Sequence, residues 1–305
     1  MRNANPSRSS QHACPRPAYG SPVSTPTIGL FLYSAAVATD PETAASTAVL
    51  AEQLGYDSLW AGEHVVVPRP RVPPSPMEPD APILDPVVLL AHLAARTRRI
   101  RLGTGVVVLP QRQPLVLAKQ LASLDVLSGG RLDVGIGAGY LEPELSALGV
   151  PMAERGRRTD DHIAAMRALW SQEKATYHGE FTRFDECISR PRPVNGTIPV
   201  HVGGHTDLAA RRAGRLGDGF FPGKGKPQEL ARTFDLVRST AREHGRDPDA
   251  IELTAGGATI GGGALQAVRE LADVGVDRVM VPACAFWRDT ADALKRYGDE
   301  VIARA

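Results

Sequence analysis

The sequence has few cysteines, few aromatic residues, almost no net charge and no long hydrophobic run. Its three cysteines show no paired spacing, so we expect neither a disulfide framework nor a metal site, and we predict a reduced, cytoplasmic protein. The formal net charge is +1 and acidic and basic residues are interspersed, which argues against nucleic acid as a partner. No apolar run reaches the roughly 20 residues of a membrane span, so no membrane partner is expected.

Several motifs of catalytic chemistry are also missing. The sequence contains no HExxH, no GxSxG and no paired Cys/His cluster, which excludes the usual zinc hydrolases and serine esterases. Residues 1–26 are rich in Ser, Pro and Asn and lack the apolar centre of a signal peptide. We predict a disordered tail there, and one domain over residues 27–305.

Two glycine-ended apolar runs are the most informative feature that is present. They are RLGTGVVVLP (residues 101–110) and RLDVGIGAGY (residues 131–140), and a helix-patterned stretch separates them. A strand, a helix and a second buried strand form a βαβ unit with parallel strands. Glycines at the carboxyl ends of such strands let a flat ligand approach the backbone closely, so we predict a cofactor there.

The same alternation of strand and helix occurs eight times, which is typical of a (β/α)8 TIM barrel. An open doubly wound sheet is the alternative, although no GxGxxG follows the first strand. Strands are expected at residues 28–32, 58–60, 101–110, 131–140, 198–202, 219–222, 252–260 and 278–282. Residues 171–197 are expected to form an inserted hairpin and loop over the barrel mouth. The proline-rich residues 65–85 are expected to be a lid or a disordered segment.

Four predicted strand ends would meet at one face of the barrel. His64 follows the second strand, where it could transfer a proton or merely cap a backbone group. Glycine-rich ends follow the third and fourth strands. The fifth ends in Gly203, Gly204, His205 and Thr206, where free N–H groups at a helix N-terminus suit a phosphate. The candidate cofactor-binding residues are Gly105, Val106, Ala138, Gly139, Gly203, Gly204 and Thr206.

Two weaker candidates for an anion lie elsewhere. Gly261, Gly262 and Gly263 follow the seventh strand, where many barrels bind phosphate, and they rival the Gly203–Gly204 pair. Lys224 and Lys226 follow the sixth strand and could meet an anionic tail or simply face solvent.

Four stretches together resemble the luciferase-like monooxygenase superfamily and, more closely, its branch that uses the deazaflavin coenzyme F420. They are AEQLGYDSLWAGEHVVVP, RIRLGTGVVVLPQRQPLVLAKQLASLDVLSGGRLDVGIGAGY, LGVPMAERGRRTDDHIAAMRALW and IPVHVGGHTDLAARRAGRLGDGFFP. The resemblance runs from about residue 27 to the C-terminus. It implies a (β/α)8 barrel that binds a flavin or deazaflavin at its carboxyl face, and a homodimer.

The resemblance also assigns residues. It implies a bulge with a non-prolyl cis peptide behind the cofactor ring, and the matching bond joins Gly105 and Val106. His64 matches the family's histidine, and we expect it and Tyr140 to be catalytic. Tyr140 stands where the sugar-phosphate branch has an acidic residue, which argues against a sugar-phosphate substrate. Gly203 and Gly204 match the pair that receives the coenzyme's phosphate, where proteins using flavin mononucleotide (FMN) often have serines.

The resemblance therefore implies an F420-dependent oxidoreductase that transfers a hydride between reduced deazaflavin and a small organic substrate. One alternative is an FMN-dependent monooxygenase that uses oxygen. Another is a flavin-binding carrier or sensor without turnover. A fourth possibility is an unrelated barrel lyase that holds a sugar phosphate at Gly261, Gly262 and Gly263.

Overall fold

The computed structural model describes residues 25–31, 33–75, 77–223, 225–256, 261–286 and 289–304. Residues 1–24 of the predicted tail lie outside these ranges, and so do Lys224 and residues 257–260 of the predicted seventh strand.

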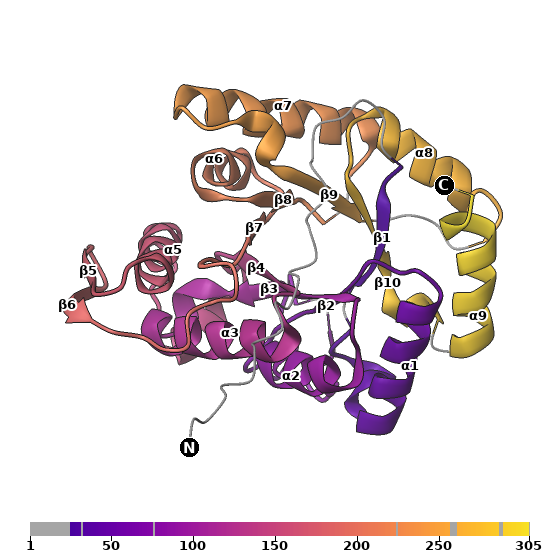
Figure 1. Cartoon of the computed structure of the whole chain (residues 1–305), viewed down its shortest axis with the longest axis horizontal. Helices are drawn as coiled ribbons and strands as arrows, with labels where there is room; N and C mark the ends of the chain where they lie inside the picture. The colour runs from indigo at the N-terminus through magenta and orange to yellow at the C-terminus, as the bar shows by residue number, and fades with distance from the viewer. Residues whose placement is uncertain are drawn as a thin grey trace, which may run out of the picture.

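In the described residues, eight parallel strands close into a barrel in the order β1-β10-β9-β8-β7-β4-β3-β2 (Figure 1). The strands are β1 (Thr27–Phe31), β2 (Ser58–Ala61), β3 (Arg101–Val108), β4 (Leu132–Gly137), β7 (Val200–Gly203), β8 (Gly219–Phe221), β9 (Glu252–Gly256) and β10 (Arg278–Pro282). The predicted (β/α)8 barrel is confirmed. Pairing of β1 with both β10 and β2 excludes the open sheet.

Helices surround this barrel, as Figure 1 shows. They are α1 (Pro41–Gln53), α2 (Pro86–Arg96), α3 (Pro114–Ser128), α4 (Glu142–Ala147), α5 (Arg155–Ser171), α6 (Asp207–Leu216), α7 (Pro227–Glu243), α8 (Ala264–Asp273) and α9 (Thr290–Tyr297). The helix starts follow the local chemistry: the Asp85 carboxylate accepts the N–H groups of Val87 and Val88, and a proline comes next. None of the described helices is long and apolar enough to cross a membrane.

A hairpin follows α5, as the sequence predicted. It consists of β5 (Ala175–His178) and β6 (Arg183–Cys187), which pair antiparallel. The Tyr177 hydroxyl and the Glu180 N–H both donate to Asp161 of α5, at 3.2 and 2.8 Å. In Figure 1 the hairpin lies on the side of α5 that faces away from the barrel strands. The prediction that it covers the barrel mouth is therefore wrong, because α5 holds it on the outside.

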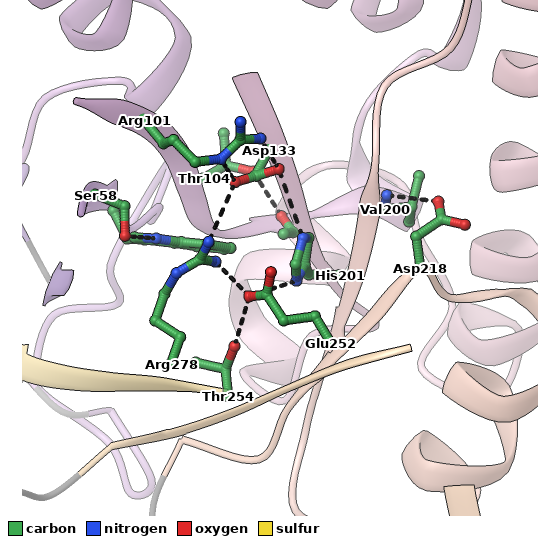
Figure 2. A network of polar contacts seen from close by, with 12 residues as sticks. Ser58, Arg101, Thr104, Asp133, Val200, His201, Asp218, Glu252, Thr254 and Arg278 are labelled. Carbon is green, nitrogen blue, oxygen red and sulfur yellow. Dashed lines mark hydrogen bonds and ion pairs between the residues drawn. The ribbon is translucent and has the colours of Figure 1, made fainter. Parts of the chain in front are cut away.

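Charged side chains fill the amino end of the barrel (Figure 2). We call the set Asp57, Arg101, Asp133, His201, Glu252 and Arg278 the amino-end network. Arg278 is almost fully buried, and its guanidinium lies 2.5 Å from Glu252 and 2.8 Å from Asp57. Arg101 pairs with Asp133 at 2.5 Å. Side chains at the starts of β3, β4, β9 and β10 thus make charge-assisted contacts at this end of the barrel.

The charged groups of this network stabilise one another in their ionised forms. Burial alone would raise the pKa of Asp133, but the charge and hydrogen bonds of Arg101, together with the contact to His201, hold that pKa well below its usual value. Asp133 is therefore ionised at neutral pH and balances a buried arginine. His201 lies between the Asp133 and Glu252 carboxylates, at 3.7 and 3.9 Å.

Removing Arg278 tests how much this network contributes to stability. Arg278→Met leaves the buried Glu252 without its arginine and removes the contact to Asp57, and we expect the free energy of unfolding to fall by about 3–5 kcal/mol. Denaturant unfolding measures it. Arg296→Met, which breaks an exposed pair with Asp289, is the matched control and should change little. A loss below about 1 kcal/mol for Arg278→Met would show that the network is not stabilising.

Candidate active site

The segment that leaves β2 carries His64 and is fastened on several sides. The Gly62 carbonyl accepts the buried Ser34 hydroxyl at 2.9 Å. The His64 Nδ1 lies 2.8 Å from Oε2 of Glu144, and the Val65 N–H donates to Oε1 of the same carboxylate at 2.6 Å. One carboxylate of α4 therefore fixes both the ring and the backbone at this strand end.

Tyr140 lies on the other side of the same imidazole. Its hydroxyl is 3.2 Å from Nε2 of His64, and the two rings meet edge to face with their centroids 6.0 Å apart. Because Nδ1 faces a carboxylate, a neutral His64 carries its proton on Nδ1 and accepts the Tyr140 O–H at Nε2. The two residues that the sequence singled out are thus brought together in one chain of hydrogen bonds.

Glu144 is the residue that the sequence analysis missed. The predicted helices did not include α4, which spans only residues 142–147 and contains Pro143. The available signal was its spacing: Glu144 comes four residues after Tyr140, one helical turn on. Its carboxylate lies 2.8 Å from His64, so an acidic group does lie beside the histidine. The side chain of Glu144 is 3% exposed and that of His64 is 10% exposed.

The surroundings of the hydrogen-bonded residues Tyr140, His64 and Glu144 shift the pKa of Glu144 and the pKa of Tyr140. Burial would raise the pKa of Glu144, but hydrogen bonds from His64 and Val65 outweigh it and lower that pKa below 4.5. Burial, helped by the nearby Glu144 charge, raises the pKa of Tyr140 above its usual value. At neutral pH the carboxylate is therefore ionised and the phenol is protonated, which suits a relay that holds a proton at His64.

The lowered pKa of Glu144 predicts a pH-dependent contribution to stability. A carboxyl group whose folded-state pKa lies below its unfolded value stabilises the fold fully above that unfolded value, and the effect fades as the pH falls through the folded value. We therefore expect wild type to exceed Glu144→Gln in unfolding free energy at pH 6, and the gap to shrink below about pH 4.5. Urea unfolding from pH 6 to pH 3.5 measures it. A gap independent of pH would contradict the assignment.

The end of β3 has the geometry that the family resemblance implied. Its register with β4 shifts between Thr104 and Val107, and the Gly105–Val106 peptide bond is cis, which confirms that prediction. The side chain of Val106 lies over two neighbouring glycines: a Cβ at Gly137 or Gly203 would come within 2.9 Å of it. These glycines make room for the Val106 side chain, which takes the space that a Cβ at either position would need.

The barrel mouth above Val106 has an apolar floor that is partly exposed. Phe31, Val106, Ala138, Gly139 and Gly203 are all half-buried, although each lies at the carboxyl end of a strand or directly after it. Phe31 packs edge-on against Phe221 with their ring centroids 5.2 Å apart. A floor of aromatic edges, a branched aliphatic side chain and bare backbone fits the flat, largely apolar ring of a flavin or deazaflavin.

The loop between β7 and α6 suits an anion only in part. Gly204 has φ +139°, but its N–H donates to the Phe221 carbonyl at 3.2 Å, and the Thr206 hydroxyl accepts the Ala209 N–H at 3.2 Å. The Gly204 N–H is therefore engaged, whereas the Thr206 hydroxyl only accepts in this contact and keeps its own hydrogen to donate. The N–H groups of Asp207 and Leu208, in the first turn of α6, have no acceptor within the helix and face its N-terminal end.

The other anion candidates are less defined. Gly261 and Gly263 have φ values of +104° and +101°, and the loop that they form before α8 is exposed. The Lys226 N–H donates to the Glu229 carboxylate at 3.1 Å at the start of α7, and both residues line a surface hollow of about 490 Å³ beside His205. Lys224 lies outside the described residues. Among the described residues, no group of three or more His, Cys, Asp or Glu could hold a metal ion.

Comparison with known proteins identifies the family. A family model described as luciferase-like monooxygenase matches residues 23–304. The chain therefore belongs to the luciferase-like monooxygenase family, which confirms the resemblance seen in the sequence.

Two curated relatives are similar in sequence. An uncharacterized protein of Mycobacterium tuberculosis is 35% identical over 240 residues, which are 76% of this chain and 81% of that protein. An F420-dependent glucose-6-phosphate dehydrogenase of Intrasporangium calvum is 36% identical over 188 residues, which are 60% of this chain and 54% of that enzyme.

Two solved structures have the same fold. An F420-dependent secondary alcohol dehydrogenase, in complex with an F420–acetone adduct, has a TM-score of 0.77 at 18% identity, over 92% of this chain and 100% of that one. The oxygenating constituent of 3,6-diketocamphane monooxygenase from Pseudomonas putida, in complex with FMN, has a TM-score of 0.73 at 16% identity, over 92% and 99%. At these identities the likeness shows the fold alone.

Proposed function

We propose that this protein is an F420-dependent oxidoreductase that transfers a hydride between the deazaflavin and a small organic substrate. The observation that carries the proposal is the chain of hydrogen bonds from Tyr140 through His64 to Glu144, which follow β4 and β2, the two strands that flank β3 and its Val106. The F420-dependent relative at 36% identity supports the choice of coenzyme. When bound, the deazaflavin supplies or accepts the hydride.

Each residue of the candidate site has its own role in this proposal. Phe31, Val106 and the strand-end glycines form the surface that the ring covers, and they exclude water from one side of it. His64 holds or releases the substrate's proton at Nε2. Glu144 fixes the orientation and tautomer of His64, because its carboxylate accepts from Nδ1. Tyr140, with its pKa raised, keeps its proton and donates a hydrogen bond to His64 or to a substrate oxygen.

Replacing His64 tests the proton-transfer role. We expect His64→Ala to lower kcat about 10²- to 10⁴-fold, the usual contribution of a positioned acid or base, while F420 affinity stays within about threefold. Steady-state kinetics and a fluorescence titration measure the two effects. Glu144→Gln, which retains an acceptor for Nδ1, should lower kcat less. Unchanged turnover in His64→Ala would remove this residue from the mechanism.

A side-by-side titration with F420 and FMN tests the coenzyme. The alternative is an FMN-dependent monooxygenase, and a 4-hydroxyprotoasukamycin monooxygenase that is 34% identical supports the oxygenase reaction. Tight F420 binding with weak FMN binding supports our proposal. Tight FMN binding with oxygen consumption dependent on a flavin reductase supports the alternative. Binding of either cofactor with no change in its redox state across a panel of substrates indicates a carrier.

The position of the coenzyme's phosphate can be tested by adding charge at two helix N-termini. Leu208 is 74% exposed in the first turn of α6, where an aspartate favours the helix but repels an anion. We expect Leu208→Asp to weaken F420 binding at least tenfold without lowering Tm. Gln266→Asp places the same charge in the first turn of α8, beside Gly263, and serves as the matched control. The reverse pattern would assign the phosphate to the rival glycine loop.

A further inference from the structure

The proline-rich loop, residues 65–84, begins and ends at the same place on the barrel. Arg112 contacts both roots of this loop: its Nη2 pairs with Glu63 before the loop and lies 2.6 Å from Asp85 after it. Ser34 also contacts both roots. Its hydroxyl donates to the Gly62 carbonyl, and its own carbonyl accepts the Leu84 N–H, each at 2.9 Å. The roots are thus held together independently of the residues between them.

Burial makes the Arg112 contact to Glu63 strong. The Glu63 side chain is 2% exposed, and its second oxygen accepts the Val108 N–H at the end of β3, at 2.7 Å. A carboxylate buried to this extent needs a cation, and within the described residues its salt bridge is with Arg112. The guanidinium keeps its charge at every accessible pH. It therefore ties the exit of β2 to the end of β3 under all conditions in which the protein folds.

The body of the loop is held by a different set of contacts. Arg69 pairs with Asp80 at 3.1 Å and Arg71 with Glu78 at 2.6 Å, and all four side chains are exposed. These pairs join one part of the loop to another. Solvent screens them, so they constrain the loop weakly compared with its buried roots.

We propose that Arg112 is a positioning residue for His64. By clasping Glu63 and Asp85, it fixes the backbone next to His64 against β3, so that the loop can change its conformation around a substrate while the imidazole stays in place. The part of this inference that concerns catalysis rests on the proposed function; the part that concerns the clasp does not.

Amide hydrogen exchange tests the clasp without any coenzyme. In Arg112→Met we expect exchange at the Val65 and Leu84 amides, which are hydrogen-bonded at the two roots, to become at least tenfold faster. Arg112→Lys keeps a cation and should restore part of the protection. Arg69→Met removes an arginine of the loop body and is the matched control, with exchange at both amides unchanged. If the Val65 and Leu84 amides of Arg112→Met exchange at the same rates as in the wild-type protein, the proposal is overturned.

Kinetics with F420 separate positioning from a merely structural role. We expect Arg112→Met to lower kcat at least tenfold, with F420 affinity within threefold of wild type, and Arg112→Lys to recover part of the loss. The pH profile of kcat should shift in Arg112→Met, because His64 is no longer held against Glu144. A parallel loss of Tm and F420 affinity, with an unshifted pH profile, would assign Arg112 a structural role only.

Two further outcomes remain decisive. If F420 does not bind the wild-type protein, the proposed function fails, and the exchange measurements still decide the clasp. If Arg112→Met does not fold, Asp85→Asn replaces it, since the asparagine oxygen still caps α2 while its NH2 group cannot accept from Arg112. Exchange should then rise at Leu84 more than at Val65. If both amides of Asp85→Asn exchange at the wild-type rates, the proposed clasp is overturned.

Discussion

The ion pairs at the amino end of the barrel are the constraint on which the rest of the structure depends. Arg278, Glu252 and Arg101 are the first residues of their strands, so their contacts fix where β10, β9 and β3 begin. In a closed barrel, fixing the starts of the strands also fixes the relative height of their carboxyl ends. The amino-end network is thus separated from the carboxyl end, where the apolar floor around Phe31 and Val106 lies beside the polar contacts of His64 and Glu144.

The glycines of the barrel serve this arrangement in two ways. Lower in the barrel, a Cβ at Gly103 would come within 2.4 Å of Trp60, and one at Gly219 within 2.1 Å of His201. These glycines accommodate large side chains of the interior. At the mouth, Gly137 and Gly203 accommodate Val106 instead. The glycine-rich runs therefore allow the packing that builds the surface proposed for the coenzyme ring.

Much of the fold could be predicted because its signals are local. Asp40–Pro41 and Asp85–Pro86 begin helices by capping, and Gly129 ends α3 with φ +73°. His64 could be found from its place after a strand, whereas Tyr140 and the cis Gly105–Val106 bond followed from the family resemblance that four segments carry together.

What could not be predicted depends on contacts between distant residues. Glu144 meets His64 across 80 positions, from a helix too short to show a period. The amino-end network requires the register of β3, β4, β9 and β10, which no single segment contains. The hairpin was predicted, but its place depends on Asp161, a polar residue with no distinguishing local pattern.

The contacts that hold His64 in place are separate from those within the proline-rich loop, residues 65–84. His64 is held through its own ring by Glu144, through Val65 by the same carboxylate, and through Glu63 by Arg112. Proton transfer requires that an imidazole be oriented to within a few tenths of an ångström, and this degree of attachment provides it. The loop from residue 65 to residue 84 departs only after these contacts are made. We therefore expect a change in the body of the loop to leave the geometry of the histidine unaltered. Under the proposed function, proton transfer would then depend on residues outside the body of this loop.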